Sequence, residues 1–226
     1  MKTQKTNFVK PQSAFTLIEL LVVIAVIGVL AAILLPVFSS LKIKATVKRI
    51  QGEMKLVENA IDAYKENVGV YPTENSKYPA TNALYYELAG SKLVGGEYQP
   101  LSGSGNITVA GLASFFGPAN TVSGFVNVTR GSGDELKPAK NCLTGLRPAQ
   151  YLEVVIGGVS GIVLGTRANV PAPLLLSDAA GQNINPWRYL SSSATNNAGR
   201  YDLWVDVIIS GKTNRFSNWR ERNFTL

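Results

Sequence analysis

Residues 15–38 read FTLIELLVVIAVIGVLAAILLPVF, and Glu19 is the one charged side chain in this stretch. Residues 20–41 contain no charge, and as a helix they would measure about 33 Å at 1.5 Å per residue. Since the hydrocarbon core of a bilayer is about 30 Å thick, the stretch predicts a membrane-spanning helix. The alternative is a cleaved secretory signal, whose apolar centre of about 7 to 15 residues would be much shorter.

Composition limits the chemistry that the rest of the chain can perform. The 226 residues include no histidine and one cysteine, Cys142, so Ser-His-Asp and Cys-His nucleophiles, histidine-ligated metals and an intrachain disulfide are excluded. We expect a protein that is not an enzyme, with Cys142 as a small buried side chain or a free thiol.

The net charge is +7, and three of the positive charges, Lys2, Lys5 and Lys10, precede the apolar stretch. Four more, Lys42, Lys44, Lys48 and Arg49, follow it, so the charges on the two sides do not fix the orientation by themselves. A short tail before the span favours a cytoplasmic N-terminus. The remaining positive excess is modest for a chain of this length, and no nucleic-acid partner is expected.

Glu19 needs an explanation, because a carboxylate at the centre of a span costs roughly 2.5 to 3.5 kcal/mol on insertion scales. It could be a tolerated interfacial glutamate that reaches the headgroups. It could instead be held for a cationic partner inside an apolar assembly, where the pair would fix the register between subunits. Composition alone leaves both open.

Residues 13–19, SAFTLIE, follow a short lysine-bearing leader and resemble the class III signal of type IV pilins and type II secretion pseudopilins. The resemblance implies that a prepilin peptidase cuts between Ala14 and Phe15 on the cytoplasmic side, removes residues 1–14, and N-methylates the new Phe15 amine. The family usually has glycine before the cut, so Ala14 is a departure from its pattern.

The resemblance continues along the chain. Gly28 and Pro36 stand where the family carries helix-weakening residues, and both lower helix stability, so we expect residues 28–36 to stretch or melt during assembly. Residues 57–65 (VENAIDAYK) and 69–73 (GVYPT) resemble the segment where the long helix of major, G-type pseudopilins ends. NPWRY at 185–189, YDLW at 201–204 and NW at 218–219 resemble a diverged version of their C-terminal landmarks.

Family analogy also raises the possibility of calcium, because major pseudopilins hold this ion in an acidic loop. In this chain the corresponding interval, residues 205–217, has Asp206 as its only acidic residue, and Lys212 and Arg215 stand where carboxylates would be wanted. Calcium requires six to eight oxygen ligands. We therefore predict no metal site and no cofactor, and consider a clasp between a cation and the backbone as a replacement.

Residues 42–68 continue the helix as its amphipathic half. Their apolar side chains recur at spacings of four and three, a pattern typical either of a coiled-coil dimer or of a helix packed on its own domain, which we favour. The stripe consists of Ile43, Val47, Ile50, Met54, Val57, Ile61, Tyr64 and Val68.

Residues 69–226 are predicted to form a globular domain. Gly69 should end the helix, residues 82–88 should form a short helix, and residues 107–109, 124–128 and 202–209 have the length and composition of strands. The glycines at 157, 161 and 165 fit a buried strand or loop. The expected fold is α+β and pilin-like, a long N-terminal helix on a small antiparallel sheet.

The resemblance implies a structural subunit of a type II secretion pseudopilus, anchored in the bacterial inner membrane with its domain in the periplasm. It would self-associate into a helical filament through residues 15–41, and Glu19 would neutralise the Phe15 amine of a neighbour. Other pseudopilins and the inner-membrane assembly platform are the expected partners. The alternatives are a type IV pilin for adhesion, motility or DNA uptake, and a membrane-anchored binding module that does not assemble.

Overall fold

The computed structural model describes residues 15–102, 104–117, 122–130, 136–169, 175–220 and 224–225. The chain divides into two compact units, Met1–Ala45 and Thr46–Leu226. Helix α1 (Leu17–Val68) belongs to both units. Its residues up to Ala45 lie in the first unit, and its residues from Thr46 form the first element of the second. The predicted leader, residues 1–14, lies outside the described residues.

In the first unit, α1 has no break in its backbone. It runs through Gly28 and Pro36, the two positions predicted to weaken it, so their effect during assembly stays a prediction. Among the described residues, no helix is both long enough and apolar enough to be identified as one that crosses a membrane.

In the second unit, the apolar stripe of α1 is buried. Ile50, Ile61 and Tyr64 have no exposed surface, because they belong to the same core cluster as side chains from the strands and from α2 (Leu84–Ala89). The helix ends where the sequence predicts, because Gly69 adopts a left-handed φ of 87° and its N–H still donates to the Lys65 carbonyl (2.9 Å).

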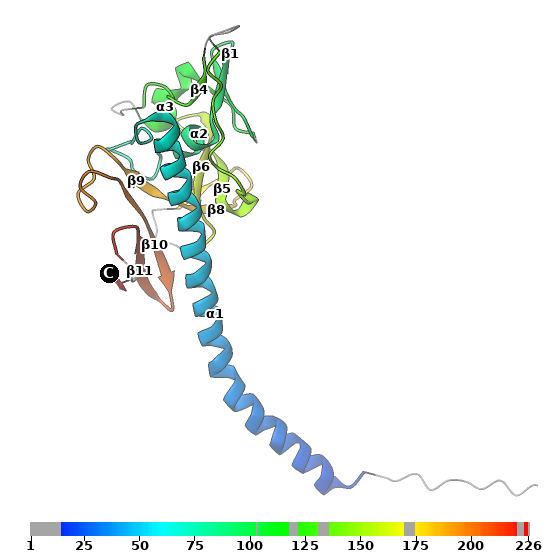
Figure 1. Cartoon of the computed structure of the whole chain (residues 1–226). Coiled ribbons are helices and arrows are strands. Elements are labelled where there is room, and N and C mark those ends of the chain that lie inside the picture. Colours follow the sequence, from blue (N-terminus) through cyan, green and yellow to red (C-terminus); the bar gives the residue numbers. More distant parts are fainter. Residues whose placement is uncertain are drawn as a thin grey trace, which may run out of the picture. The chain divides into compact units, whose positions relative to one another are not determined.

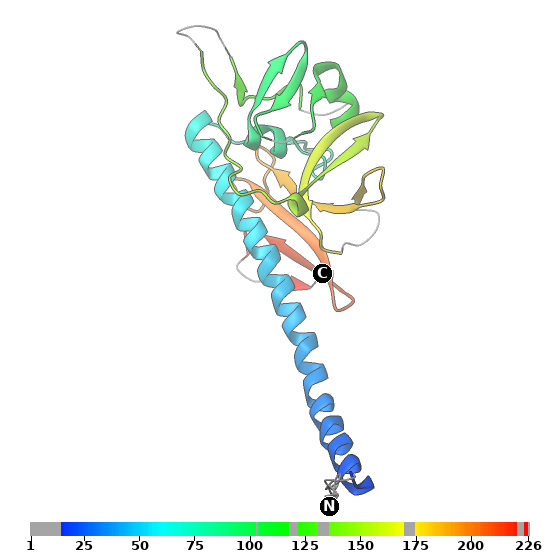
Figure 2. The ribbon, with the colours of Figure 1, turned by 90° about the vertical axis from the view of Figure 1, so that its right-hand side faces the viewer.

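Burial of this stripe decides between the two interpretations of residues 42–68. Figures 1 and 2 show the cyan part of α1 beside β9 (Arg188–Leu190) and β10 (Asp202–Ile209). Since the stripe from Ile50 to Tyr64 is covered by its own chain, it is not available for a coiled-coil partner. The preference for packing within the subunit is confirmed at these positions.

The described residues of the domain form three four-stranded sheets, with orders β3-β2-β1-β4, β5-β6-β8-β7 and β12-β11-β10-β9. The first contains β1 (Ser91–Val94), β2 (Glu97–Pro100), β3 (Ile107–Thr108) and β4 (Val128–Thr129). The second contains β5 (Tyr151–Ile156), β6 (Val159–Thr166), β7 (Leu176–Ser177) and β8 (Asn183–Pro186). The third adds β11 (Lys212–Ser217) and β12 (Phe224–Thr225) to β9 and β10. Short helical elements are η1 (Val109–Gly111), α3 (Leu112–Phe116) and η3 (Pro148–Gln150).

The α+β class is confirmed, but the expectation of one small antiparallel sheet is wrong in two respects. There are three sheets among the described residues, and β1 pairs with β4 in parallel, Ser91 opposite Val128 and Lys92 opposite Thr129. The short helix predicted at residues 82–88 is present as α2, and β10 covers the strand predicted at 202–209.

The strand predicted at residues 124–128 is almost absent. Only Val128 of these residues belongs to a strand, because the buried Glu87 carboxylate accepts hydrogen bonds from the backbone N–H groups of Val126 (2.9 Å) and Asn127 (3.0 Å). These donors are therefore unavailable to a neighbouring strand. The same carboxylate accepts from the Tyr64 hydroxyl (2.9 Å), which ties α1 to α2.

The glycine-rich segment forms the β5–β6 hairpin, and the predicted buried strand or loop is confirmed for Gly161 and Gly165, which are buried in β6, but not for Gly157, which is exposed in the turn. Gly157 and Gly158 make the turn, with φ values of 59° and 78°. Gly165 lies where β6 pairs with β8, and a Cβ there would be 2.4 Å from the Asn185 carbonyl oxygen. This position therefore requires glycine for close approach of two backbones.

Candidate assembly site

The start of α1 is a capping box formed by two residues of the SAFTLIE motif. The Thr16 hydroxyl accepts from the Glu19 backbone N–H (3.3 Å), and the Glu19 carboxylate accepts from both the Thr16 backbone N–H (2.8 Å) and the Thr16 hydroxyl (2.7 Å). Such reciprocal bonds satisfy N–H groups that have no partner within the helix. Glu19 also lies where the helix dipole favours a negative charge.

This geometry gives Glu19 a local role in the single chain that the sequence analysis did not consider. The signal was present, since Thr16 and Glu19 have the T-x-x-E spacing of a capping box before an apolar run. Phe15, the predicted processed terminus, directly precedes the cap, and its side chain is 80% exposed. Cleavage before Phe15 would therefore create an amine on the residue directly before Thr16, the first residue of the capping box.

The apolar side chains that follow the cap are uncovered in the single chain. Leu17 is 81% exposed, Ile18 64% and Ile24 59%, and exposure continues through Leu30 and Ile33. Monomeric soluble proteins rarely expose a contiguous apolar surface of this kind. In the single chain, the described part of the first unit therefore presents exposed apolar side chains from Leu17 to Ile33.

The other predicted site residues are not brought together with Glu19 in the described structure. Ala14, on the leader side of the predicted cleavage point, lies outside the described residues. Gly28 lies in α1, and a Cβ there would have nothing within 4 Å. Pro36 also lies in α1. The roles of these residues in cleavage and assembly stay predictions.

The interval in which family analogy raised calcium is a β-hairpin. Strands β10 and β11 pair along their length, with Trp204 opposite Ser217 at one end and Ile209 opposite Lys212 at the other. Asp206 lies opposite Arg215. The Arg215 guanidinium donates two hydrogen bonds to the Asp206 carboxylate, Nε to Oδ1 at 2.6 Å and a terminal nitrogen to Oδ2 at 2.8 Å. This bidentate pair holds the hairpin and occupies the carboxylate that a metal would need.

Within the described part of the chain, no group of three or more Cys, Asp or Glu side chains is arranged to hold a metal ion. The pair nevertheless differs from the clasp that the sequence suggested. Arginine binds a carboxylate side chain on the opposite strand, not a backbone carbonyl. Cys142 is a half-buried free thiol.

Two further carboxylates, which sequence reasoning missed, fix the loop between β9 and β10. Asp202 accepts from the backbone N–H groups of Thr195, Asn196 and Asn197 at 2.8–3.0 Å. Burial alone would raise the pKa of Asp202, but these hydrogen bonds outweigh it and lower the pKa. Glu74 similarly accepts from the hydroxyls of Ser192 and Ser193, both at 2.8 Å. No sequence motif predicts the hydrogen bonds that Asp202 and Glu74 accept from this loop.

Comparison with known proteins places the strongest similarity at the N-terminus. Residues 9–35 match the model of the prokaryotic N-terminal methylation motif. The type IV major alpha-pilin of Moraxella bovis is 38% identical over 96 residues, covering 35% of this chain and 60% of the relative. Type II secretion system core protein G of Escherichia coli K12 is 42% identical over 64 residues, covering 28% and 44%. Fimbrial protein Q of Moraxella bovis is 48% identical over 52 residues, covering 23% and 33%.

The matched regions span between 33% and 60% of the length of these three relatives, so the similarity concerns one part of the chain. No solved structure matches the chain. The relatives are named as pilin, fimbrial and secretion-system core proteins, names of structural subunits and not of enzymes. With the methylation motif at residues 9–35 and these similarities, the chain shows in its N-terminal region the likeness to type IV pilins and type II secretion pseudopilins that its sequence predicts.

Proposed function

We propose that this chain is a structural subunit of a type II secretion pseudopilus, processed between Ala14 and Phe15 and assembled through the first part of α1. The observation that carries the proposal is the combination of the methylation motif at residues 9–35 with an exposed apolar helix. An apolar surface of this extent needs a bilayer before assembly and neighbouring subunits after it. Both environments follow from one filament-forming role.

Glu19 has a defined task in this mechanism. In the single chain its carboxylate is satisfied by Thr16. In a filament core the dielectric is low, so an unpaired terminal amine on a neighbour's Phe15 would be costly. Glu19 would then pair with that amine, and the pair would set the register of adjacent subunits. Removal of residues 1–14 is needed before this amine exists.

The cellular arrangement follows from the same role. The N-terminus would face the cytoplasm, where a prepilin peptidase removes the leader and methylates Phe15. Residues 15–41 would cross the inner membrane, and the second unit would lie in the periplasm as the outer surface of the filament. Other pseudopilins and the inner-membrane assembly platform would be its partners. The subunit would perform no catalysis and need no cofactor.

A type IV pilin is the second candidate. One observation favours it: the similarity to the Moraxella bovis type IV pilin extends over 96 residues, compared with 64 for core protein G of Escherichia coli. The two roles differ in what the filament does, since a pseudopilus exports folded proteins and a pilus is a surface fibre. A membrane-anchored module that does not assemble is the third possibility, and it would form no filament.

Glu19→Ala tests the assembly mechanism. We expect the variant subunit to fold and enter the membrane normally but to form few or no filaments when co-expressed with a pseudopilus assembly system. Glu66→Ala is the matched control, because Glu66 is an exposed glutamate in the second part of the same helix. Sheared filaments are quantified by immunoblotting. Abundant filaments from Glu19→Ala, equal to those from the control, would overturn the mechanism.

The choice between the two filament types needs a separate assay. A secretion-deficient host that lacks its own major pseudopilin is complemented with this chain, and export of a reporter enzyme is measured. Restored export supports the pseudopilus role. Surface fibres without restored export support the type IV pilin.

A further inference from the structure

The second unit has two surface cavities that share Gly145 in their linings. One has a volume of about 290 Å³ and lies between α1 and the segment that contains η3. The other has a volume of about 440 Å³ and lies over residues 141–146 and the start of β5. Together they are in the size range of ligand sites, about 300–1,000 Å³. Neither belongs to the assembly site.

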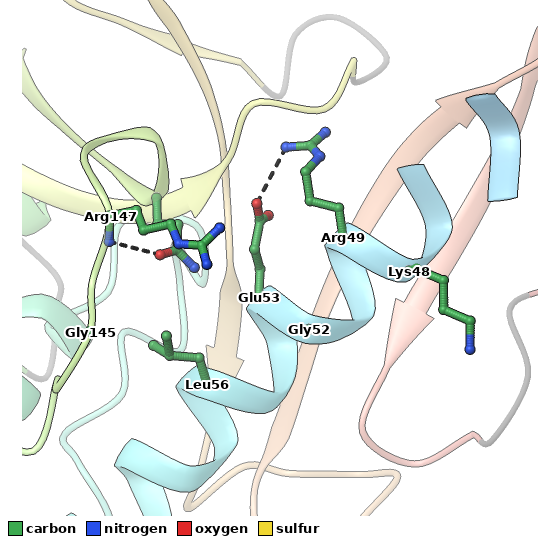
Figure 3. A pocket seen from close by; sticks show the side chains of 8 residues that line it. Lys48, Arg49, Gly52, Glu53, Leu56, Gly145 and Arg147 are labelled. Atoms are coloured by element: carbon green, nitrogen blue, oxygen red, sulfur yellow. Dashed lines mark hydrogen bonds and ion pairs between the residues drawn. The ribbon is translucent and has the colours of Figure 1, made fainter. Parts of the chain in front are cut away.

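The first cavity is lined by two arginines, Arg49 and Arg147, and by one glutamate, Glu53. Arg49 and Glu53 are on α1, and Arg49 donates to Glu53 Oε1 at 3.3 Å. Figure 3 shows the Arg147 side chain extending from its loop toward the helix, while Lys48 points away. Gly52 leaves space, because a Cβ at this position would have nothing within 4 Å.

Two groups in this cavity lack partners within the described residues. Glu53 Oε2 is buried and accepts no hydrogen bond there, and the side chain as a whole is only 11% exposed. The guanidinium of Arg147 donates to no described residue, while its backbone N–H donates to Gln150 Oε1 (2.8 Å). A buried acceptor without a donor is costly. A ligand that satisfies both groups would present an anion to Arg147 and a hydroxyl to Glu53.

The second cavity has a different character. Its lining combines Tyr85 and Tyr151, stacked with ring centroids 6.1 Å apart, with hydroxyl and amide side chains. Asn141 donates to the Ser102 hydroxyl at 3.0 Å, and Thr144 is exposed at the edge. Tyr85 is buried behind Tyr151, which is half-buried, and a half-buried aromatic ring beside hydroxyl and amide groups suits a ligand with apolar C–H faces and many hydroxyls.

We propose that the two cavities form one binding site for an acidic oligosaccharide. A carboxylate of one sugar would accept from Arg147 and Arg49, and a neighbouring hydroxyl would donate to the Glu53 carboxylate. The next sugar would lie in the second cavity, against Tyr151. Glu53 has a selective effect, because it repels a bare anion but accepts from an anion that carries a hydroxyl. This site would give the outer surface of the subunit a binding activity in addition to its structural role.

The test is isothermal titration of the full chain in a polyoxyethylene detergent, which carries no sugar. The probes are a hexamer of galacturonic acid, monomeric galacturonic acid, neutral maltohexaose and inorganic phosphate. We expect the acidic hexamer to bind at least about tenfold more tightly than each other probe. Arg147→Ala should weaken hexamer binding about tenfold, because a charge-assisted hydrogen bond is lost.

Two further variants separate this site from general charge attraction. Lys92→Ala removes an exposed positive charge from β1 and should leave hexamer binding unchanged. Glu53→Gln should narrow the preference for the hexamer over phosphate, because it removes the charge that repels a bare anion. Arg147 is exposed, so its variant is expected to fold, and the Glu53 result gives a second, independent readout.

Several results would overturn the proposal. Equal binding of maltohexaose would show that the charge is irrelevant, and equal binding of phosphate would indicate a site for bare anions only. Hexamer binding that Arg147→Ala and Lys92→Ala weaken to the same extent would be unspecific attraction. Absence of hexamer binding, together with loss of filaments in Arg147→Ala, would assign the first cavity to an acidic side chain of a neighbouring subunit.

Discussion

The Tyr64→Phe substitution removes one hydrogen bond from the junction between α1 and the domain and changes nothing else in size. The Tyr64 hydroxyl donates to Glu87 Oε2 at 2.9 Å, and both side chains have no exposed surface. A hydrogen bond to a charged group contributes about 1.5–3 kcal/mol. Glu87 keeps its backbone donors from Val126 and Asn127, so we expect a loss near the lower limit, about 1.5 kcal/mol.

For a chain of this length, 1 kcal/mol corresponds to a change in melting temperature of about 2–4 °C. The melting temperature of the variant should therefore be about 3–6 °C lower than that of the wild type. Melting of the full chain in detergent is monitored by near-ultraviolet circular dichroism. Tyr78→Phe is the matched control, because Tyr78 is 43% exposed and its hydroxyl makes no hydrogen bond to a described residue. A Tyr64→Phe melting temperature equal to that of the control would refute the reasoning.

The loss of stability in the Tyr64→Phe variant should depend on pH. Burial raises the pKa of Glu87 above the value in an unfolded chain. Stability therefore decreases as pH rises from the unfolded pKa to the folded pKa, and it is constant outside this window. The Tyr64 hydroxyl favours the ionised carboxylate, so its removal raises the folded pKa further. The stability difference between the variant and the wild type should be larger at about pH 8 than at about pH 4.

Two other predictions concern the domain. Gly165→Ala should prevent normal folding or lower stability by more than about 2 kcal/mol, measured by urea unfolding, because its Cβ would lie 2.4 Å from the Asn185 carbonyl oxygen. A stability within about 0.5 kcal/mol of wild type would contradict the packing described. Arg215→Met should lower stability by about 2 kcal/mol, because Asp206 loses two charge-assisted hydrogen bonds, whereas exchange of calcium for a chelator should leave the wild-type melting temperature unchanged. A melting temperature that rises with calcium would contradict the assignment of this hairpin to an ion pair.

The long helix was predictable because its signals are local. The spacing of apolar residues identified the buried stripe from Ile50 to Tyr64, and Gly69 marked the end of the helix. The same locality explains the successful prediction of α2 and β10. The capping box at Thr16 was equally local and could have been recognised from its T-x-x-E spacing.

The three sheets were not predictable, because they depend on contacts between residues distant in sequence. Residues 124–128 have the composition of a strand, yet a carboxylate about forty positions earlier captures two of their N–H groups. The parallel pairing of β1 with β4 and the two neighbouring cavities likewise have no local signature. Asp206 and Arg215 were singled out in the sequence, but their pairing required the register of the hairpin.

The measurement that tests the central claim most directly is the intact mass of the protein purified from membranes of a host that expresses a prepilin peptidase. The account predicts a chain that has lost residues 1–14 and gained one methyl group, with Phe15 as its first residue. An uncut chain in the presence of active peptidase, shown by processing of a known prepilin in the same cells, would contradict it.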